Sequence, residues 1–305
     1  MVKKILVSTS SFAETSNEAI EILQKSEYEI IKNPYKRKLS KSEIRELIDD
    51  DVIGIIAGLE ELSESTLQNS NIKVISRVGS GITNIDQDYI KENNIKLFIT
   101  PTGPTNAVAE ITVMNMLNLL KHTYEMNLKM HDNKWERKIG NEIKNKNIVI
   151  FGYGRIGKKV SELLECFKAN VFFVDPFIKK EDAPHNLIDK HEAIRIADII
   201  TIHVNHDETI IFKEDFEKMR KKAVILNSSR GKCILEEDLI HAINTGVVGG
   251  AWIDAFEQEP YSGPLVNYDN VILTPHAASY TQECRSEMEL EATKNILNFL
   301  NQNSI

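Results

Sequence analysis

Short apolar runs alternate with helix-like patterns along almost the whole chain, and this alternation constrains the fold more than any other feature. In the first hundred residues, the runs expected as strands lie at 4–7, 28–31, 51–57, 72–75 and 95–98. Further runs lie at 148–151, 171–174, 199–204, 223–226, 249–253 and 271–273. Strands joined through helices by short connections form parallel sheets that are covered on both faces. The sequence therefore predicts an α/β fold with doubly wound parallel sheets.

Chain length and two helical patterns indicate how these strands divide. At 305 residues the chain is too long for one comfortable core and too short for three, so two domains are expected. A helical pattern from Ala107 to Met130 carries too many apolar residues for one stripe and should be buried from several sides. An amphipathic helix over 283–301 should return to the first domain. We expect one domain of residues 1–99 with 280–305, and a second of residues 100–279.

The charge balance limits the partners. The formal net charge is −8, and the hydrophobic (42%) and charged (27%) fractions are those of an ordinary soluble globular protein. Nucleic acid and anionic membranes attract basic surfaces, so neither is expected as a partner. An acidic protein that binds an anionic substrate needs a local cluster of positive groups.

Cysteine and histidine usage points to a reducing compartment and to no bound metal. Cys166, Cys233 and Cys284 lie far apart and fit neither a disulfide framework nor CxxC spacing. The pair His203-x-x-His206 lacks the accompanying carboxylates or thiols of a metal site. The first apolar run is too short for a signal peptide, and no run approaches the roughly 18 apolar residues of a membrane span. We therefore expect a cytoplasmic protein.

The most specific local signal is NIVIFGYGRIGKKVSELLECF, in which an apolar strand runs through a glycine-rich turn directly into a helix. Gly152 permits the tight turn, Gly154 lets the backbone approach a pyrophosphate, and Gly157 allows close packing of helix on strand. The free N–H groups of the first helical turn would then receive the diphosphate. GxGxxG alone is weak evidence, but the strand–turn–helix context is what the dinucleotide motif requires. The second domain is therefore predicted to be a Rossmann domain.

An acidic residue follows the next strand at the distance that this motif expects. Asp175 ends VFFVD, 18 residues after Gly157. A carboxylate there can accept both ribose hydroxyls and would repel a 2′-phosphate, which favours NAD over NADP. A solvated Asp at a strand end is the alternative, and the glycine motif outweighs it.

Three chemically suited side chains follow three different strands of the second domain: Arg230, Glu259 and His276. The carboxyl ends of parallel strands meet at one edge of the sheet, which is where ligands of open α/β sheets bind. Reduction of a 2-keto acid needs a cation for the carboxylate and a group of near-neutral pKa for the carbonyl oxygen. A carboxylate beside that His would favour its protonated form. Each residue alone could be an ordinary loop residue, but together they predict an active site.

Seven segments between residues 77 and 279 also match the motifs of one enzyme family in order. They are RVGSGITNID (77–86), TPTGPTNAVAE (100–110), FGYGRIG (151–157), ADIITIHV (197–204), ILNSSRG (225–231), IDAFEQEP (253–260) and ILTPHAAS (272–279). Through these segments the chain resembles the D-isomer-specific 2-hydroxyacid dehydrogenases over essentially its whole length. The resemblance implies a Rossmann NAD-binding domain, a flavodoxin-like substrate domain and a homodimer.

The resemblance also implies roles for individual residues. The catalytic residues would be Arg230, Glu259 and His276. Cofactor contacts would be made by Ser80, Gly152, Gly154, Arg155, Ile156, Gly157, Asp175, His203, Val204, Ser228, Ser229, Asp254 and Ala278. Asp254 would hold the nicotinamide amide. Contacts to a small anionic 2-hydroxy or 2-keto acid would come from Arg77, Val78, Gly79, Ser80 and Asn84.

Within the family, KNPYKRKLSKSEIRELI and IAGLEEL resemble the D-3-phosphoglycerate dehydrogenase branch, in which an Arg at the position of Arg77 faces the substrate phosphate. The expected reaction is therefore 3-phosphoglycerate to 3-phosphohydroxypyruvate, as in serine biosynthesis. Asn205 and Thr83 depart from the usual Pro and Asp, and a carboxyl-terminal regulatory domain is not expected. A glyoxylate or hydroxypyruvate reductase is the enzyme alternative, and an NAD-sensing binding protein is the alternative from another class.

Overall fold

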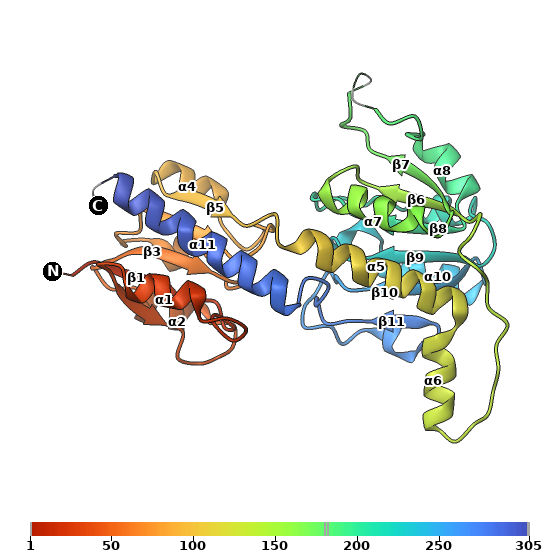
Figure 1. Cartoon of the computed structure of the whole chain (residues 1–305), viewed down its shortest axis with the longest axis horizontal. Coiled ribbons are helices and arrows are strands. Elements are labelled where there is room, and N and C mark those ends of the chain that lie inside the picture. Colours follow the sequence, from red (N-terminus) through yellow and green to blue (C-terminus); the bar gives the residue numbers. More distant parts are fainter. Residues whose placement is uncertain (1, 180, 182, 304–305) are drawn as a thin grey trace. The chain divides into compact units, whose positions relative to one another are not determined.

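The computed structural model describes residues 2–179, 181 and 183–303. These form two compact units, one of Met1–Pro104 with Tyr280–Ile305 and one of Thr105–Ser279. Each unit contains its own parallel sheet with helices packed against it (Figure 1). The predicted class of two doubly wound parallel-sheet domains is confirmed.

The first unit contains a five-stranded parallel sheet in the order β2-β1-β3-β4-β5. This is the flavodoxin-like order, in which the chain reverses direction across the sheet between β1 and β3. The strands are β1 (Lys4–Val7), β2 (Glu29–Lys32), β3 (Val52–Ala57), β4 (Val74–Arg77) and β5 (Lys96–Ile99). The helices are α1 (Glu18–Gln24), α2 (Lys41–Leu47), α3 (Glu64–Leu67), α4 (Gln87–Glu92) and α11 (Gln282–Gln302).

The helix α11, near the carboxyl end of the chain, belongs to this first unit. α11 contacts β3, β4 and β5 and lies beside α1 (Figure 1). A Cβ atom on Gly54 of β3 would lie 2.8 Å from the Cδ1 atom of Ile296, so the helix packs closely on the middle of the sheet. Inside the helix, the buried carboxylate of Glu289 accepts from the backbone N–H of Ala13 (2.8 Å) and pairs with Arg285 (2.8 Å). The helix therefore also fixes the loop that follows β1.

The second unit contains a six-stranded parallel sheet in the order β11-β10-β9-β8-β6-β7. A parallel bridge from Phe173 to Leu187 extends the edge beyond β7, which completes the Rossmann order around β6. The strands are β6 (Asn147–Phe151), β7 (Asn170–Val174), β8 (Ile199–Ile202), β9 (Ala223–Asn227), β10 (Val248–Ile253) and β11 (Val271–Leu273). The helices are α5 (Pro104–Lys121), α6 (Thr123–His131), α7 (Arg155–Glu165), α8 (Lys190–Ile196), α9 (Lys213–Phe216) and α10 (Glu236–Asn244).

Both faces of this second sheet are covered by apolar packing. Alternate residues of one strand enter different cores: Val149 and Phe151 join one cluster, and Ile148 and Ile150 join the other. Burial on two faces gives strands that read as continuous apolar runs, which is why the sequence located them well.

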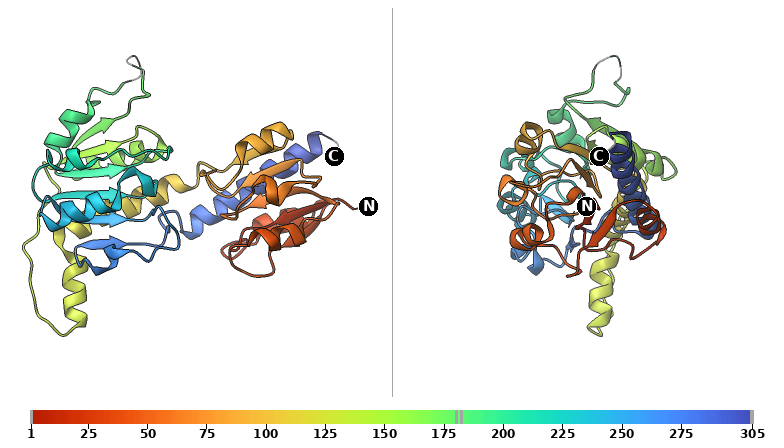
Figure 2. Two further views of the ribbon diagram at one scale, coloured as in Figure 1. Left: turned by 180° about the vertical axis from the view of Figure 1, so that it is seen from behind. Right: turned by 90° about the vertical axis from the view of Figure 1, so that its left-hand side faces the viewer.

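The predicted long helix from Ala107 to Met130 is wrong in one respect. His122 takes a left-handed conformation (φ 54°) and divides the segment into α5 and α6. α5 packs against the sheet through Val108, Met116 and Leu120, as its apolar pattern predicts. α6 instead extends away from the sheet of its unit (Figure 2). The apolar periodicity continues through the break, so it gave no sign of the turn.

None of the helices formed by the described residues combines the length and the apolar character needed to cross a membrane. Within the same residues, His, Cys, Asp and Glu side chains nowhere form a group of three or more that could hold a metal ion.

Candidate functional site

The turn between β6 and α7 has the shape that the glycine motif requires. Gly152 has φ 103°, and a Cβ atom there would lie 2.5 Å from the carbonyl oxygen of His203. A Cβ atom on Gly157 would lie 2.2 Å from the carbonyl oxygen of Gly152, so helix and turn are in direct backbone contact. Gly154 differs, because a Cβ atom there would meet nothing within 4 Å. The turn is thus closed beneath its first and third glycines and open at the second, where α7 begins.

Asp175 lies against this turn at the end of β7. Its Oδ2 accepts a hydrogen bond from the backbone N–H of Tyr153 (2.9 Å), and its Oδ1 accepts from that of Phe177 (3.0 Å). The side chain is half-buried, so each oxygen keeps a lone pair for a ribose hydroxyl. This arrangement fits the diol of NAD and disfavours an added 2′-phosphate.

The other predicted cofactor residues lie along the same carboxyl edge of the sheet, with different surroundings. Burial lowers the pKa of His203 to about 3, so this ring is neutral, and its Nε2 lies 2.9 Å from the hydroxyl of Thr201. Ser228 has a buried hydroxyl that makes no hydrogen bond within the described part of the chain, as expected for a group that awaits a ligand. Ser229, by contrast, turns its hydroxyl inward to Asn227 (3.1 Å).

The first turn of α7 and the loops beside it hold the remaining predicted contacts. Arg155 is exposed, and Ile156 and Val204 are half-buried. The open second glycine, the exposed first helical turn and the Asp175 carboxylate together fit a bound dinucleotide.

His276 and Glu259 form a hydrogen-bonded pair, although they are 17 positions apart in the chain. The imidazole Nδ1 lies 3.0 Å from each carboxylate oxygen of Glu259. The hydrogen bond to Glu259 raises the pKa of His276, burial opposes this rise, and the negative charges of Glu259 and Asp254 add to it. Since Nδ1 is engaged and the side chain is 42% exposed, Nε2 is the nitrogen that can meet a ligand.

Asp254, which directly follows β10, holds the loop that carries His276. Its carboxylate is fully buried and accepts from the hydroxyl of Thr274 (2.5 Å) and from the backbone N–H groups of Ala277 (2.8 Å) and Ala278 (2.9 Å). The indole N–H of Trp252 in turn donates to Thr274 (2.9 Å). These bonds fix the backbone on both sides of His276. The sequence predicted only a nicotinamide contact for Asp254 and gave no sign of the parts that Thr274 and Trp252 play.

Arg230 follows β9 in a turn that is organised by Asn227, another residue that the sequence motifs did not reveal. The Asn227 amide donates to the carbonyl of Arg230 (2.8 Å) and accepts from the backbone N–H of Ser229 (3.1 Å). One guanidinium nitrogen of Arg230 donates to the Ser229 carbonyl (2.7 Å), and the buried Nε has no hydrogen-bond partner among the described residues. The positive charge of Arg230 lowers the pKa of His276, which places the two groups within electrostatic reach. The structure thus brings the three predicted catalytic residues together in one unit.

The predicted substrate residues lie at the carboxyl end of β4, whose last residue is Arg77, and on the segment that follows it in the first unit. Gly79 (φ 134°) brings the loop over Arg77, which is buried and donates to the carbonyl of Val78. The backbone N–H of Gly79 donates to the Thr100 hydroxyl (2.7 Å), and Ser80 is exposed. Asn84 follows on the same segment, and its side-chain amide donates to the backbone carbonyl of Glu60 (2.5 Å).

A second buried group lies at the same edge of this first sheet. The Glu60 carboxylate is 1% exposed and accepts from the Ser8 hydroxyl and from the backbone N–H of Gly58 (2.6 Å). Ser8 and Gly58 directly follow β1 and β3, where the strand order reverses. One sequence signal could have located this group, namely the unusual Gly-Leu-Glu-Glu that follows an apolar strand.

Comparison with known proteins assigns the family. The model of the D-isomer specific 2-hydroxyacid dehydrogenase NAD binding domain matches residues 113–278. This chain belongs to the D-isomer specific 2-hydroxyacid dehydrogenase family. The family predicted from the sequence is therefore confirmed, together with NAD as the cofactor and the assignment to a family of oxidoreductases.

Relatives within the family carry different names. The D-3-phosphoglycerate dehydrogenase of Archaeoglobus fulgidus is 33% identical over 294 residues, which cover 93% of this chain and 55% of the relative. The chain spans about half the length of this relative and of the Synechocystis enzyme of the same name. The hydroxypyruvate reductase of Thermotoga maritima is 31% identical over 85% of this chain and 88% of its own length. Among solved structures, NAD+-bound 3-phosphoglycerate dehydrogenase from Entamoeba histolytica has a TM-score of 0.84 at 26% identity, over 99% of this chain and 97% of that one.

Replacement of Glu259 by Gln should lower the pKa of His276, because the hydrogen bond and charge of the carboxylate are the main causes of its rise. The protonated imidazole then stabilises the native fold less at low pH. In the wild type this contribution is present below the ordinary His pKa of about 6.5 and is lost as pH rises through the folded value. NMR titration of the His276 ring in the ligand-free protein measures the change. Glu257→Gln, which removes an exposed charge from the same loop, is the control, and an equal pKa in E259Q and wild type would contradict the assignment.

Proposed function

We propose that this chain is an NAD-dependent dehydrogenase that interconverts a small D-2-hydroxy acid and its 2-keto acid. The observation that carries this proposal is the His276–Glu259 pair, with Arg230 nearby, at the carboxyl edge of a sheet that carries a dinucleotide turn. An NAD-sensing binding protein would have no need of an imidazole whose pKa is raised. Catalytic turnover of any 2-hydroxy acid separates the two functions.

In this mechanism His276 moves the proton. Its Nε2 donates a proton to the C2 oxygen of a keto acid in reduction and removes it from the hydroxyl in oxidation. Glu259 stabilises the imidazolium through Nδ1 and fixes the ring orientation. Arg230 offers its guanidinium to the substrate carboxylate, and its Nε, which no described residue engages, is a further donor for that purpose. NAD, when bound, supplies or accepts the hydride at C2.

Asp254 keeps a second role in the proposal, as a contact for the nicotinamide amide. Three of its acceptor positions already bind the His276 loop, through Thr274, Ala277 and Ala278. One carboxylate would thus contact the nicotinamide and also hold the loop that carries the acid–base group. The proposal also keeps the contacts predicted for the first unit. Residues 77–80 and Asn84 would contact the substrate, and Ser80 would also contact the cofactor.

His276→Ala should lower kcat by roughly 10²–10⁴-fold, the usual contribution of general acid–base catalysis, and leave NADH affinity close to that of the wild type. Absorbance of NADH gives the rate, and NADH fluorescence gives the affinity. His191→Ala, at a surface helix of the same unit, is the control. Turnover at the wild-type rate in H276A would refute the role of the imidazole.

For the substrate, we propose 3-phosphoglycerate, oxidised to 3-phosphohydroxypyruvate as in serine biosynthesis. Two relatives at 33% and 34% identity carry the name D-3-phosphoglycerate dehydrogenase, and Arg77 is a cation at the carboxyl edge of the substrate sheet. Hydroxypyruvate or glyoxylate is the second candidate, favoured by the T. maritima relative, whose length this chain nearly matches, and by the inward orientation of Arg77.

A panel of 2-hydroxy and 2-keto acids, with and without phosphate, decides between these substrates. If phosphate is recognised by Arg77, Arg77→Ala should lower the ratio of kcat/KM for 3-phosphohydroxypyruvate over hydroxypyruvate at least about tenfold, since a hydrogen bond to a charged group contributes about 1.5–3 kcal/mol. General damage to the fold lowers both values and cancels in the ratio. An unchanged ratio, with hydroxypyruvate the better substrate, would select the second candidate.

We also propose that the protein works in the cytoplasm, where its three free cysteines stay reduced.

We further propose that the chain forms a homodimer through α6 and the segment after it. Trp135 and Ile139 are 80% and 98% exposed, and Met114 and Met130 add half-exposed side chains on α5 and α6. Such an apolar surface is typical of a subunit interface. Trp135→Asp should shift sedimentation from dimer to monomer, and Val266→Asp, an equally drastic change at another exposed site of the same unit, should not. A wild-type monomer would exclude the dimer.

A further inference from the structure

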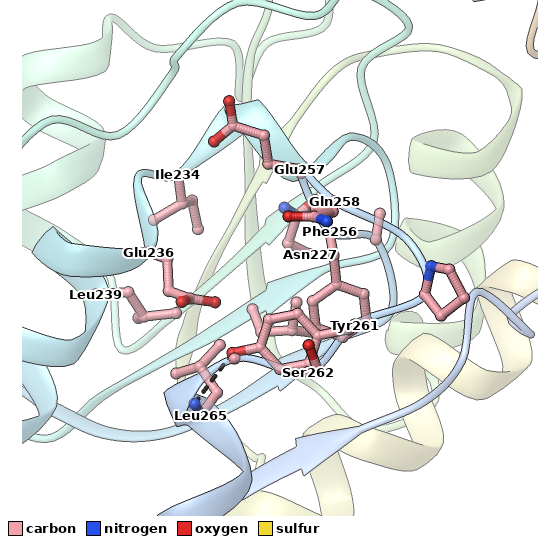
Figure 3. Close-up of a pocket in the computed structure, with 15 residues that line it drawn as sticks. Asn227, Ile234, Glu236, Leu239, Phe256, Glu257, Gln258, Tyr261, Ser262 and Leu265 are labelled. Atoms are coloured by element: carbon pink, nitrogen blue, oxygen red, sulfur yellow. Dashed lines mark hydrogen bonds between the residues drawn. The ribbon is translucent and has the colours of Figure 1, made fainter. Parts of the chain in front are cut away.

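Behind the loop that carries Glu259 lies a pocket between residues 256–263 and α10 (Figure 3). Its lining includes Phe256, Tyr261, Glu236 and Leu265, which the proposed mechanism does not use. The other three surround the side chain of Tyr261, which lies on the same loop as Glu259.

Tyr261 is fixed at both ends of its side chain. Its ring stacks on that of Phe256, with centroids 4.2 Å apart and planes 20° from parallel. Its hydroxyl accepts a hydrogen bond from the backbone N–H of Leu265 (3.0 Å, the dashed line in Figure 3), and burial, together with the nearby Glu236 of α10, raises its pKa to about 12. Gly263 leaves room for it, since a Cβ atom there would lie 2.4 Å from the hydroxyl oxygen. The ring therefore ties the loop to the body of the unit.

Phe256, the partner of this ring, supports two catalytic residues through its backbone. Its N–H donates to Oε1 of Glu259 (3.1 Å), the same oxygen that lies 3.0 Å from His276. On its other side, a Cβ atom on Gly231 would lie 2.1 Å from the carbonyl carbon of Phe256. Gly231 directly follows Arg230, so a shift of Phe256 disturbs the turn of Arg230 as well as the orientation of Glu259.

We propose that Tyr261 is a positioning residue for the reaction: by holding Phe256, it keeps the Glu259 carboxylate directed at His276. The inference deepens the proposed function and rests on it for the effect on catalysis. Tyr261 does not touch the reacting atoms. Its effect passes through Phe256 to Glu259, and the charged groups that face His276 stay the same, namely Glu259, Asp254 and Arg230.

The test compares Tyr261→Ala with Tyr261→Phe. The Ala variant loses the stacked ring, so Glu259 should turn away from His276 in part of the molecules. The value of kcat should fall by up to about 100-fold, since a displacement near 1 Å can cost that much. The pH above which reduction slows should also move down. Tyr261→Phe keeps the stack and should recover most of the loss in kcat. KM for NADH should stay close to that of the wild type in both variants.

Tyr268→Ala is the matched control, because Tyr268 is a half-buried tyrosine packed on the same core cluster. A purely structural effect would lower the melting temperature of both Ala variants and leave the pH profile of each unchanged. In the Glu259→Gln background, Tyr261→Ala should have little further effect on the pH profile, since the two residues act in series.

NMR titration of His276 in the ligand-free protein separates this inference from the proposed function. A lower pKa of His276 in Tyr261→Ala supports the positioning role even if no acid on the substrate panel is turned over. An unchanged pKa and pH profile in Tyr261→Ala would overturn it, whatever the reaction is.

Discussion

The buried carboxylate of Asp254 is the interaction on which the carboxyl edge of the second unit's sheet depends. It directly follows β10 and gathers a hydroxyl and two backbone N–H groups from the loop after β11. A buried carboxylate is costly unless several donors satisfy it, so these three hydrogen bonds favour one conformation of the loop. The placement of His276 follows from that conformation.

The position and the protonation of His276 depend on three neighbouring charged residues. Asp254 sets the backbone around His276, Glu259 sets the charge on the ring, and Arg230 opposes that charge. The opposition matters because an acid–base group works best when its pKa stays within reach of neutral pH. The hydrogen bond to Glu259 raises the pKa of His276, and burial and, more weakly, the guanidinium of Arg230 counter that rise.

How much of this could be predicted from the sequence depends on the kind of interaction involved. The strands were readable because both faces of each sheet are buried, so that segments such as Ile148–Phe151 are uniformly apolar. Arg230, Glu259 and His276 could be grouped because parallel strands deliver their carboxyl ends to one edge. The roles of Asn227 and Thr274 could not be predicted, since their bonds go to backbone groups or to carboxylates whose positions depend on loop conformation. The same holds for the turn at His122, where a non-glycine residue takes a left-handed backbone inside a continuous apolar pattern.

The backbone at His276 has an unfavourable conformation, which the hydrogen bonds of neighbouring residues maintain. Its φ of 52° lies in the left-handed region, which disfavours most side chains by roughly 1–2 kcal/mol and which glycine adopts freely. The bonds of Asp254 on both sides impose that conformation, so the cost is present whether or not the imidazole is useful. Substitution of His276 by Gly or Asn, which adopt this conformation more readily, would therefore relieve the backbone strain and remove the imidazole at the same time.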